Sequence, residues 1–354
     1  MAGDYAQTVA ASIVKQLEDG TAPWVKPWEP SGLRFIPYNA ITGKDYQGGN
    51  AIWLMAVAEM KGYSDPRWTT YKQAQSLDAQ VRKGEKGTLI QYFKKLDRVP
   101  VKDEQGRPVK DAEGNQVYRS VELERPRVFS AVVFNAEQIA GMPKIEARPV
   151  LAEWERHAAA EQIMSNSGVP IIYRPGDRAF YTLAQDRVTM PEREQFMTAD
   201  RFYSTALHEL GHATGHPSRL NRQDLGTPFG SEAYAREELR AEIASLMIAD
   251  KLGIGHDPGQ HAAYVGSWIK ALQQDPREIF RAAADAEKIS GYLMALRSEQ
   301  KAGQAAGRSD DAQAGDQARG YWQRAAESGA EIRRAERAEQ PEQERQTRRA
   351  TAGR

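Results

Sequence analysis

Apolar side chains recur at two different spacings along this chain, and the spacings predict where helices and strands lie. Residues 4–19 carry apolar positions at the helical period and end at Gly20, a common helix terminator. The stretch 48–62 has the same period, which predicts a buried helix that ends at Gly62. Further helices are predicted over 69–77, 151–166, 198–214, 232–252, 259–273 and 276–298.

From Thr88 the apolar positions alternate, as they do in strands. Segments 88–101 and 116–135 flank a stretch with two turn signals, which predicts a long hairpin or a three-stranded meander. A second extended segment, 169–190, has a turn at Pro175–Gly176. Together these elements predict an α+β protein, in which a mixed α/β domain precedes a mainly helical domain with a small β-sheet.

Interruptions in the pattern predict the domain boundaries. Two prolines break the pattern within 141–150, so we place one domain over 1–145 and a second over 146–300. Beyond residue 300 the chain consists mostly of Ala, Gln, Glu and Arg, with few large apolar side chains to form a core. Residues 301–354 are therefore expected to form a polar, charged, disordered tail.

Composition narrows the classes of function. The chain has no cysteine, which excludes disulfides, iron–sulfur clusters and cysteine zinc sites and leaves His, Asp and Glu as metal ligands. The formal net charge is zero, so a nucleic-acid role needs a local basic surface. The first 20 residues do not form a signal peptide, and no stretch is apolar for long enough to span a bilayer. We therefore expect a cytoplasmic protein with no membrane partner.

The stretch ALHELGHATGH, residues 206–216, holds three of the six histidines. His208 and His212 are four residues apart, so on the predicted helix both imidazoles lie on one face, as two ligands of a tetrahedral zinc ion require. Glu209 lies beside them, where it is placed to take a proton from a water molecule that the metal acidifies. The alternative is an amphipathic helix whose two histidines are solvated or satisfied in the core.

A zinc site needs a third protein ligand. Metzincins carry a histidine six residues after the second one, where this chain has Ser218, so that class is excluded. His216 follows the glycine that ends the helix, and Asp224 lies at the spacing found in aspartate-liganded zincins. Both stay open as alternatives.

The predicted helix 232–252 offers a better candidate. Glu238 and Glu242 flank its apolar face, and carboxylates beside a packed face need partners. We predict Glu238 as the third ligand and Glu242 as the support of a ligand histidine, with the reverse assignment as the main alternative. The competing explanation is a surface glutamate run that pairs with Arg236 and Arg240. Such a His–His–Glu site suits Zn²⁺, and the sequence does not distinguish Zn²⁺ from Mn²⁺ or Co²⁺.

Aromatic and basic residues alternate in short clusters in the first domain, at 24–28, 67–72, 82–86, 92–95 and 125–129. Single-stranded nucleic acid is bound by such mixtures, because cations face the phosphates and flat rings stack on the bases. Since aromatic residues more often belong to cores, the pattern alone is a weak signal.

Longer motifs carry a resemblance to a known family. The first domain resembles the N-terminal single-stranded-DNA-binding domain of the ArdC antirestriction family, also found in TraC-type plasmid primases, in PWVKPW, PYNAITGKDYQGGNAIWL, PRWTTYKQAQSLDAQVRKGEKGTLI and VFNAEQIAGMP. The second domain resembles the zincin metallopeptidase domain that follows it in ArdC, in TALHELGHATGHPSRLNR and YAREELRAEIAS. The resemblance covers residues 5–298 in the family's order.

This resemblance implies single-stranded-DNA binding by the first domain. It also implies a metal triad of His208, His212 and a glutamate of the second helix, with Glu209 as the base. The resemblance does not fix which residues contact DNA. From chemistry and motif position we predict these contacts to be Trp24, Trp28, Asn50, Trp68, Tyr71, Arg82, Lys83 and Lys86.

Two functions of different classes follow. The first is a single-stranded-DNA-binding antirestriction protein that protects incoming plasmid DNA during conjugation. The second is an active zinc endopeptidase directed to DNA-bound proteins, with restriction–modification subunits as candidate partners; segment 178–190, just before the site helix, matches the edge strand that binds the substrate backbone in zincins. A replication or primase accessory role is a remoter alternative, because the sequence has no acidic-cluster polymerase motif.

Overall fold

The computed structural model describes residues 2–25, 32–112, 114–148, 152–256 and 264–297. The predicted tail, the predicted DNA contact Trp28 and the first turns of the helix predicted from 259 lie outside these residues. The mixture of helices and strands confirms the α+β class. Among the described residues, no helix is long and apolar enough to cross a membrane.

The N-terminal half builds a four-stranded sheet on two helices. Its strands run in the order β1-β2-β5-β4; β1 is parallel to β2, and the other neighbours are antiparallel. Strands β3 and β6 form a separate two-stranded antiparallel sheet. The elements are α1 (Ala2–Glu18), η1 (Pro23–Val25), β1 (Tyr38–Asn39), α2 (Gly49–Lys61), β2 (Arg67–Thr70), α3 (Tyr71–Gln75), β3 (Gln80–Val81), β4 (Thr88–Pro100), β5 (Tyr118–Asn135), η2 (Ala136–Gln138) and β6 (Ile139–Ala140).

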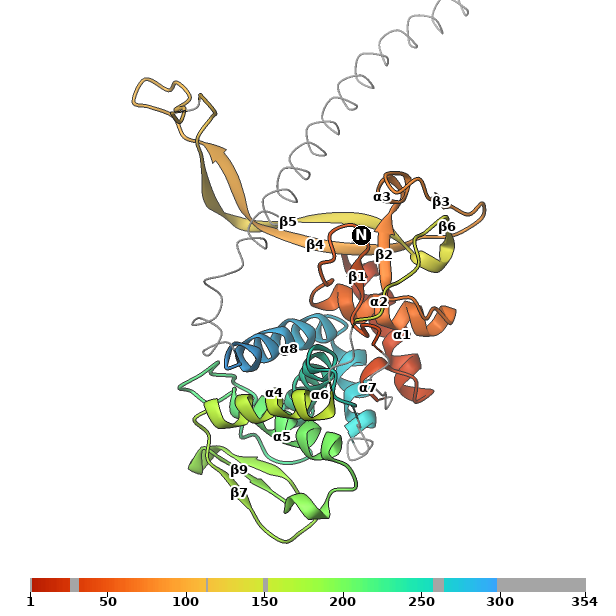
Figure 1. Cartoon of the computed structure of the whole chain (residues 1–354). Helices are drawn as coiled ribbons and strands as arrows, with labels where there is room; N and C mark the ends of the chain where they lie inside the picture. The colour runs from red at the N-terminus through yellow and green to blue at the C-terminus, as the bar shows by residue number, and fades with distance from the viewer. Residues whose placement is uncertain (1, 26–31, 113, 149–151, 257–263, 298–354) are drawn as a thin grey trace, which may run out of the picture. The chain divides into compact units, whose positions relative to one another are not determined.

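Strands β4 and β5 form the predicted long hairpin rather than a meander. Their ladder runs from the pair Thr88 and Val133 to the pair Pro100 and Tyr118, with one irregularity after Lys94. The two strands are much longer than β1 and β2, so they extend past the rest of the sheet as a two-stranded ribbon (Figure 1). We call this part of the hairpin, residues 89–100 and 118–132, the β4–β5 ribbon.

The C-terminal half is mainly helical, as predicted. Its small sheet has the order β7-β9-β8, so β8 is an edge strand. Strand β7 pairs with β9 in parallel, and β8 pairs with β9 in the antiparallel direction. The elements are α4 (Glu153–Asn166), β7 (Ile171–Tyr173), β8 (Phe180–Thr182), η3 (Leu183–Gln185), β9 (Arg187–Met190), η4 (Arg193–Gln195), α5 (Ala199–Ala213), α6 (Glu232–Leu252), α7 (Val265–Gln274) and α8 (Glu278–Ala295).

Helix α6 occupies the centre of this half. The hydroxyl of Ser231 accepts a hydrogen bond from the backbone N–H of Tyr234 and begins the helix, and Gly253 ends it with a left-handed φ of 69°. The helix packs on α5, α7 and α8, and nearly all its residues after the first turn are buried. Its carboxylates are therefore held inside the protein, where they need partners.

One hydrophobic core extends through both predicted domains. Helix α1 packs on α7, and α2 packs on α8. Two carboxylates add to this contact: the buried Asp250 accepts a hydrogen bond from the backbone N–H of Phe35 at 2.6 Å, and the half-buried Glu287 accepts one from that of Gly48 at 2.5 Å. Burial raises the pKa of both carboxyl groups. The boundary placed after residue 145 therefore does not divide the core, and the described residues up to 297 belong to one compact unit.

Candidate metal centre

Helix α5 places the two histidines of the HELGH motif side by side. Thr198 begins the helix by accepting a hydrogen bond from the backbone N–H of Arg201. His208 and His212 lie in the last two turns of the helix, and both side chains are buried. Their Nε2 atoms are 3.1 Å apart, because a spacing of four residues puts both imidazoles on one face.

Glu238 of helix α6 completes the set of three donors. Its Oε2 lies 3.6 Å from Nε2 of His208, and its Oε1 lies 3.6 Å from Nε2 of His212. The donor atoms of these three buried residues lie within 4.8 Å of one another. In a tetrahedral site with bonds of about 2.1 Å, neighbouring donors are about 3.4 Å apart. The observed separations match this spacing, so the three residues fit a small divalent ion.

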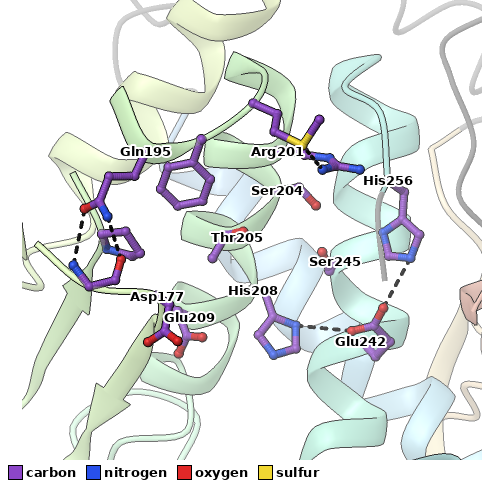
Figure 2. A pocket seen from close by; sticks show the side chains of 14 residues that line it. Asp177, Gln195, Arg201, Ser204, Thr205, His208, Glu209, Glu242, Ser245 and His256 are labelled. Carbon is purple, nitrogen blue, oxygen red and sulfur yellow. Dashed lines mark hydrogen bonds and ion pairs between the residues drawn. The ribbon is translucent and has the colours of Figure 1, made fainter. Parts of the chain in front are cut away.

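A carboxylate supports His208 from the other side of its ring. Oε2 of Glu242 lies 3.4 Å from Nδ1 of His208, and Oε1 of Glu242 lies 3.3 Å from Nε2 of His256 (Figure 2). His256 also hydrogen-bonds to the backbone carbonyl of Trp24 at 3.0 Å. This geometry favours Glu238 as the ligand and Glu242 as the support, and it links the metal centre to the N-terminal half.

A second carboxylate, which was not selected from the sequence, supports His212. Oε1 of Glu237 lies 3.2 Å from Nδ1 of His212. The guanidinium of Arg222 donates to both oxygens of Glu237 and to the backbone carbonyl of Gly211 at 2.8 Å. The carboxylate is thereby fixed against the imidazole, which orients the ring. The only signal was the position of Glu237 directly before Glu238.

The surrounding charges shift the pKa values of the three candidate ligands. Burial opposes a charged imidazole, but the hydrogen bonds to Glu238 and Glu242 outweigh it and raise the pKa of His208 to about 9. The pKa of His212 is raised for the same reason, with Glu238 and Glu237 as partners. Burial acts against the charged form of Glu238 too, yet the two imidazoles hold its pKa well below the usual range.

The alternatives for the third ligand have other partners. Nδ1 of His216 hydrogen-bonds to the hydroxyl of Ser218 at 2.7 Å. Asp224 receives two hydrogen bonds from Arg236, both 3.1 Å long. Arg240 pairs with Glu278 at 2.9 Å and with Asp285 at 3.0 Å. Glu237, Glu238 and Glu242 are thus not a surface run paired with Arg236 and Arg240, because all three are buried against histidines.

Two cavities border the site, and His208 and Glu209 line both of them. One has a volume of about 520 Å³ and is lined by His208, Glu209 and Glu242 together with residues of η4 and α5 (Figure 2). The other has a volume of about 270 Å³ and is lined by His208, Glu209, His212 and Glu238. Phe180 and Tyr181 of strand β8 also line this second cavity. A peptide could therefore reach Glu209 beside an unpaired strand edge.

Two tyrosines face the same smaller cavity. The hydroxyl groups of Tyr234 and Tyr264 are 3.3 Å apart. Burial and the nearby carboxylate of Glu238 raise the pKa of Tyr234, so its hydroxyl stays protonated at neutral pH. Both tyrosines are hydrogen-bond donors beside the candidate ligand, and neither was selected from the sequence.

The predicted DNA contacts fall into three groups. Trp24 and Trp68 were wrong predictions, because both side chains are fully buried in the core and have no free ring face for a base. The side chain of Asn50 is hydrogen-bonded to the backbone of β4: it donates to the carbonyl of Gln91 at 2.7 Å and accepts from the N–H of Gln91 at 3.2 Å. Exposed side chains remain at Tyr71, Arg82, Lys83 and Lys86.

Family models match both halves of the chain. Residues 3–134 match the N-terminal domain of anti-restriction factor ArdC, and residues 158–285 match a zincin-like metallopeptidase. The chain is also similar to two DNA primases TraC of Escherichia coli, with 57% identity over 297 residues and 58% over 299 residues. It spans only 20% and 27% of the lengths of these primases. An uncharacterized protein of Sinorhizobium fredii, y4eC, is 37% identical, and the chain covers 93% of it.

Two solved structures of an ArdC protein also resemble this chain. The metal-free crystal structure of the antirestriction protein ArdC from plasmid R388 is 34% identical, with a TM-score of 0.64 over 83% of this chain and 98% of that one. Its Mn(II)-bound structure matches with a TM-score of 0.63 at 33% identity and the same coverage. A zincin-like domain, a His–His–Glu donor set and a metal-bound relative agree with a Zn²⁺ site that also admits Mn²⁺. The chain therefore belongs to the ArdC antirestriction family, with an ArdC-type N-terminal domain followed by a zincin-like metallopeptidase domain.

Proposed function

We propose that this protein binds single-stranded DNA through its N-terminal half and protects incoming plasmid DNA from restriction during conjugation. We further propose that it holds a divalent metal ion, Zn²⁺ in the first place, at His208, His212 and Glu238. The observation that carries the metal site is the convergence of these three buried donors at 3.1–3.6 Å. Membership of the ArdC family supports the antirestriction role.

The chemistry of the exposed residues supports DNA binding. Although the chain has no net charge, Arg82, Lys83 and Lys86 are exposed in one short loop before β4. Such a local basic surface attracts phosphates. We therefore expect full-length protein to bind a labelled single-stranded oligonucleotide more tightly than its duplex, with an affinity that falls as salt rises. Fluorescence anisotropy at two salt concentrations tests this, and equal binding of the two forms would contradict it.

Hydrolysis of a peptide bond is the second candidate function. A bound divalent ion supplies Lewis acidity, which polarises a substrate carbonyl and lowers the pKa of water at the site. Glu209 borders both cavities, so its carboxylate is placed to take a proton from the attacking water and to return it to the leaving nitrogen. Strand β8 offers an edge for the substrate backbone beside it.

One substitution separates the two candidates. Glu209→Gln keeps the shape of the side chain and leaves the three metal donors untouched, but an amide cannot act as a base. We expect the variant to keep its metal content, fold and DNA binding. Full protection of transferred DNA by this variant, measured as conjugation frequency into a restricting recipient, would exclude hydrolysis as the function. Loss of protection, with metal and DNA binding intact, would favour the peptidase.

A His208→Asn/His212→Asn variant provides the matched control. It removes two metal donors while the DNA-contact surface stays unchanged. Protection that survives this variant would show that neither the metal nor hydrolysis is needed. A replication or primase accessory role stays the remoter proposal, supported only by the similarity of this chain to part of the TraC primases.

A further inference from the structure

The β4–β5 ribbon, which extends past the rest of its sheet, exposes many large apolar side chains. Eight of these side chains have more than a third of their surface exposed, whereas large apolar side chains are usually buried in a core. They are Leu89, Tyr92, Phe93, Tyr118, Val121, Val128, Phe129 and Val132.

One face of the ribbon continues the buried core. Successive side chains of a strand point to opposite faces, so Ile90 and Tyr92 share one face and Phe93 belongs to the other. Ile90 and its neighbour Val133 are buried in the core, and β4 packs there on α2. Tyr92 continues this same face one step farther along the strand, where it is half exposed.

An aromatic pair marks this continuation. Tyr92 and Phe129 lie directly opposite each other in the ladder. Their ring centroids are 5.7 Å apart and the rings are nearly parallel, at 13°. Tyr92 is 50% exposed and Phe129 is 39% exposed, so both rings keep free surface. Flat, parallel and accessible rings are what an unstacked base requires.

Positive charge lies around the aromatic pair. Arg127 follows Phe129 at the next position of the same face, and 62% of its side chain is exposed although it pairs with Asp97 at 3.0 Å. Segments 82–95 and 125–135 together contain seven basic residues and one acidic residue, in a chain whose net charge is zero. The local excess of positive charge complements a phosphate backbone.

We propose that single-stranded DNA lies along this face of the β4–β5 ribbon, with at least one base stacked on Tyr92 and Phe129 and phosphates near Arg127. The inference rests on the proposed function, which it extends by giving the DNA a binding surface. A stacking surface of rings and cations binds every sequence, because each base has a π-face. That suits a protein that must act on any transferred strand.

Variants on the two faces of the same strands test the proposal in the full-length protein. Tyr92→Leu/Phe129→Leu keeps apolar side chains but removes both flat rings. Phe93→Leu is the control, because this ring is 58% exposed on the opposite face. With a labelled oligo(dT) we expect the double variant to bind about tenfold more weakly or worse, and the control to bind within twofold of wild type. Tyr92→Phe, which keeps the ring, should also bind like wild type.

An abasic oligonucleotide of the same length separates base stacking from phosphate contacts. It has the same charges but no bases, so wild type and the double leucine variant should bind it equally. A second measurement needs no variant: an oligonucleotide with 5-iodouracil is irradiated with wild-type protein, and the crosslinked peptides are identified by mass spectrometry. Crosslinks to Tyr92 or Phe129 support the proposal, and crosslinks confined to other segments overturn it.

The outcomes distinguish this inference from the proposed function beneath it. If wild type binds single-stranded DNA and the double leucine variant binds equally well, the ribbon surface is wrong while DNA binding stands. If Phe93→Leu weakens binding as much, the assignment to one face fails. If wild type shows no preference for the single strand, the proposed function itself fails. If the double variant changes only the sedimentation behaviour of the protein, the face is a contact between copies of the chain and the inference is wrong.

Discussion

Glu237 offers the sharpest test of how the metal centre is held. The substitution Glu237→Gln preserves volume, but it removes the charge that Arg222 and His212 share. In the wild-type protein both oxygens of this carboxylate accept hydrogen bonds from Arg222, and Oε1 lies 3.2 Å from Nδ1 of His212. An amide has one acceptor oxygen, so its NH₂ group must face a donor: either Nε of Arg222, or the nitrogens of Arg222 and His212 that now lie at Oε1.

The structure sets the size of two effects. Loss of a carboxylate that orients a ligand imidazole lowers metal affinity by about 10- to 100-fold, or roughly 1.4–2.8 kcal/mol. The guanidinium of Arg222, only 8% exposed, also loses its buried partner. Breaking such a pair costs about 3–5 kcal/mol, and we take the lower end because the amide still accepts one hydrogen bond. For a unit of 297 residues this lowers Tm by about 5 °C.

Competition with a chelating dye measures Zn²⁺ affinity at a temperature where the variant is folded, and calorimetry gives Tm. Glu232→Gln is the matched control on the same helix: its carboxylate is half exposed and pairs with Arg236 at 3.1 Å. It should bind the metal like wild type. Zn²⁺ affinity of Glu237→Gln within twofold of wild type would refute the orienting role.

Three further predictions concern pH, the core and the link to the N-terminal half. Folding raises the pKa of His208 from 6.5 to about 9, so protonation of this ring stabilises the metal-free protein fully below pH 6.5, and this stabilisation is lost as pH rises through 9. Because Zn²⁺ must displace that proton, the Zn²⁺-induced rise in Tm should grow between pH 6.5 and 9. A rise in Tm that does not change with pH, measured by scanning fluorimetry, would contradict this. Trp68→Ala should lower the free energy of unfolding, measured in urea, by about 3–5 kcal/mol, because the ring is fully buried. A variant that loses DNA binding while its stability is unchanged would instead support the predicted DNA contact of Trp68. His256→Ala removes a contact to Glu242, so we expect about tenfold weaker Zn²⁺ binding by dye competition, and unchanged affinity would show that Glu242 needs no such partner.

Local patterns predicted much of this protein correctly. Helix α6 has the predicted bounds 232–252, because its Ser231 cap, continuous helical period and Gly253 terminator all lie in adjacent sequence. The position of Glu209 beside His208 and His212 follows from the helical period too. Such features depend on neighbours a few residues apart, so no distant contact is needed to specify them.

Burial of aromatic residues was the point where local patterns failed. Trp24 and Trp68 lie in motifs with basic neighbours, which suggested DNA contacts, yet both rings are in the core. Composition cannot separate the two cases, since an aromatic ring suits both a core and a stacking surface. Tyr92 and Phe129 lie in two of the aromatic and basic clusters of the sequence, but only the ladder showed that they lie opposite each other and that both are exposed.

The sequence by itself determined the longer helices, the long hairpin, the α+β class and the pair of histidines with their neighbouring glutamate, because helical and strand periods act over short distances. It did not predict the short strands β1, β2, β3 and β6, and the helix predicted over 69–77 is limited to Tyr71–Gln75. Only the tertiary structure decided which glutamate of α6 faces the histidines, since that depends on how α6 is rotated against α5. The same packing brought Arg222 to Glu237 and His256 to Glu242. Contacts between elements far apart in the chain follow from the shapes of the packed side chains, and no spacing along the sequence encodes them.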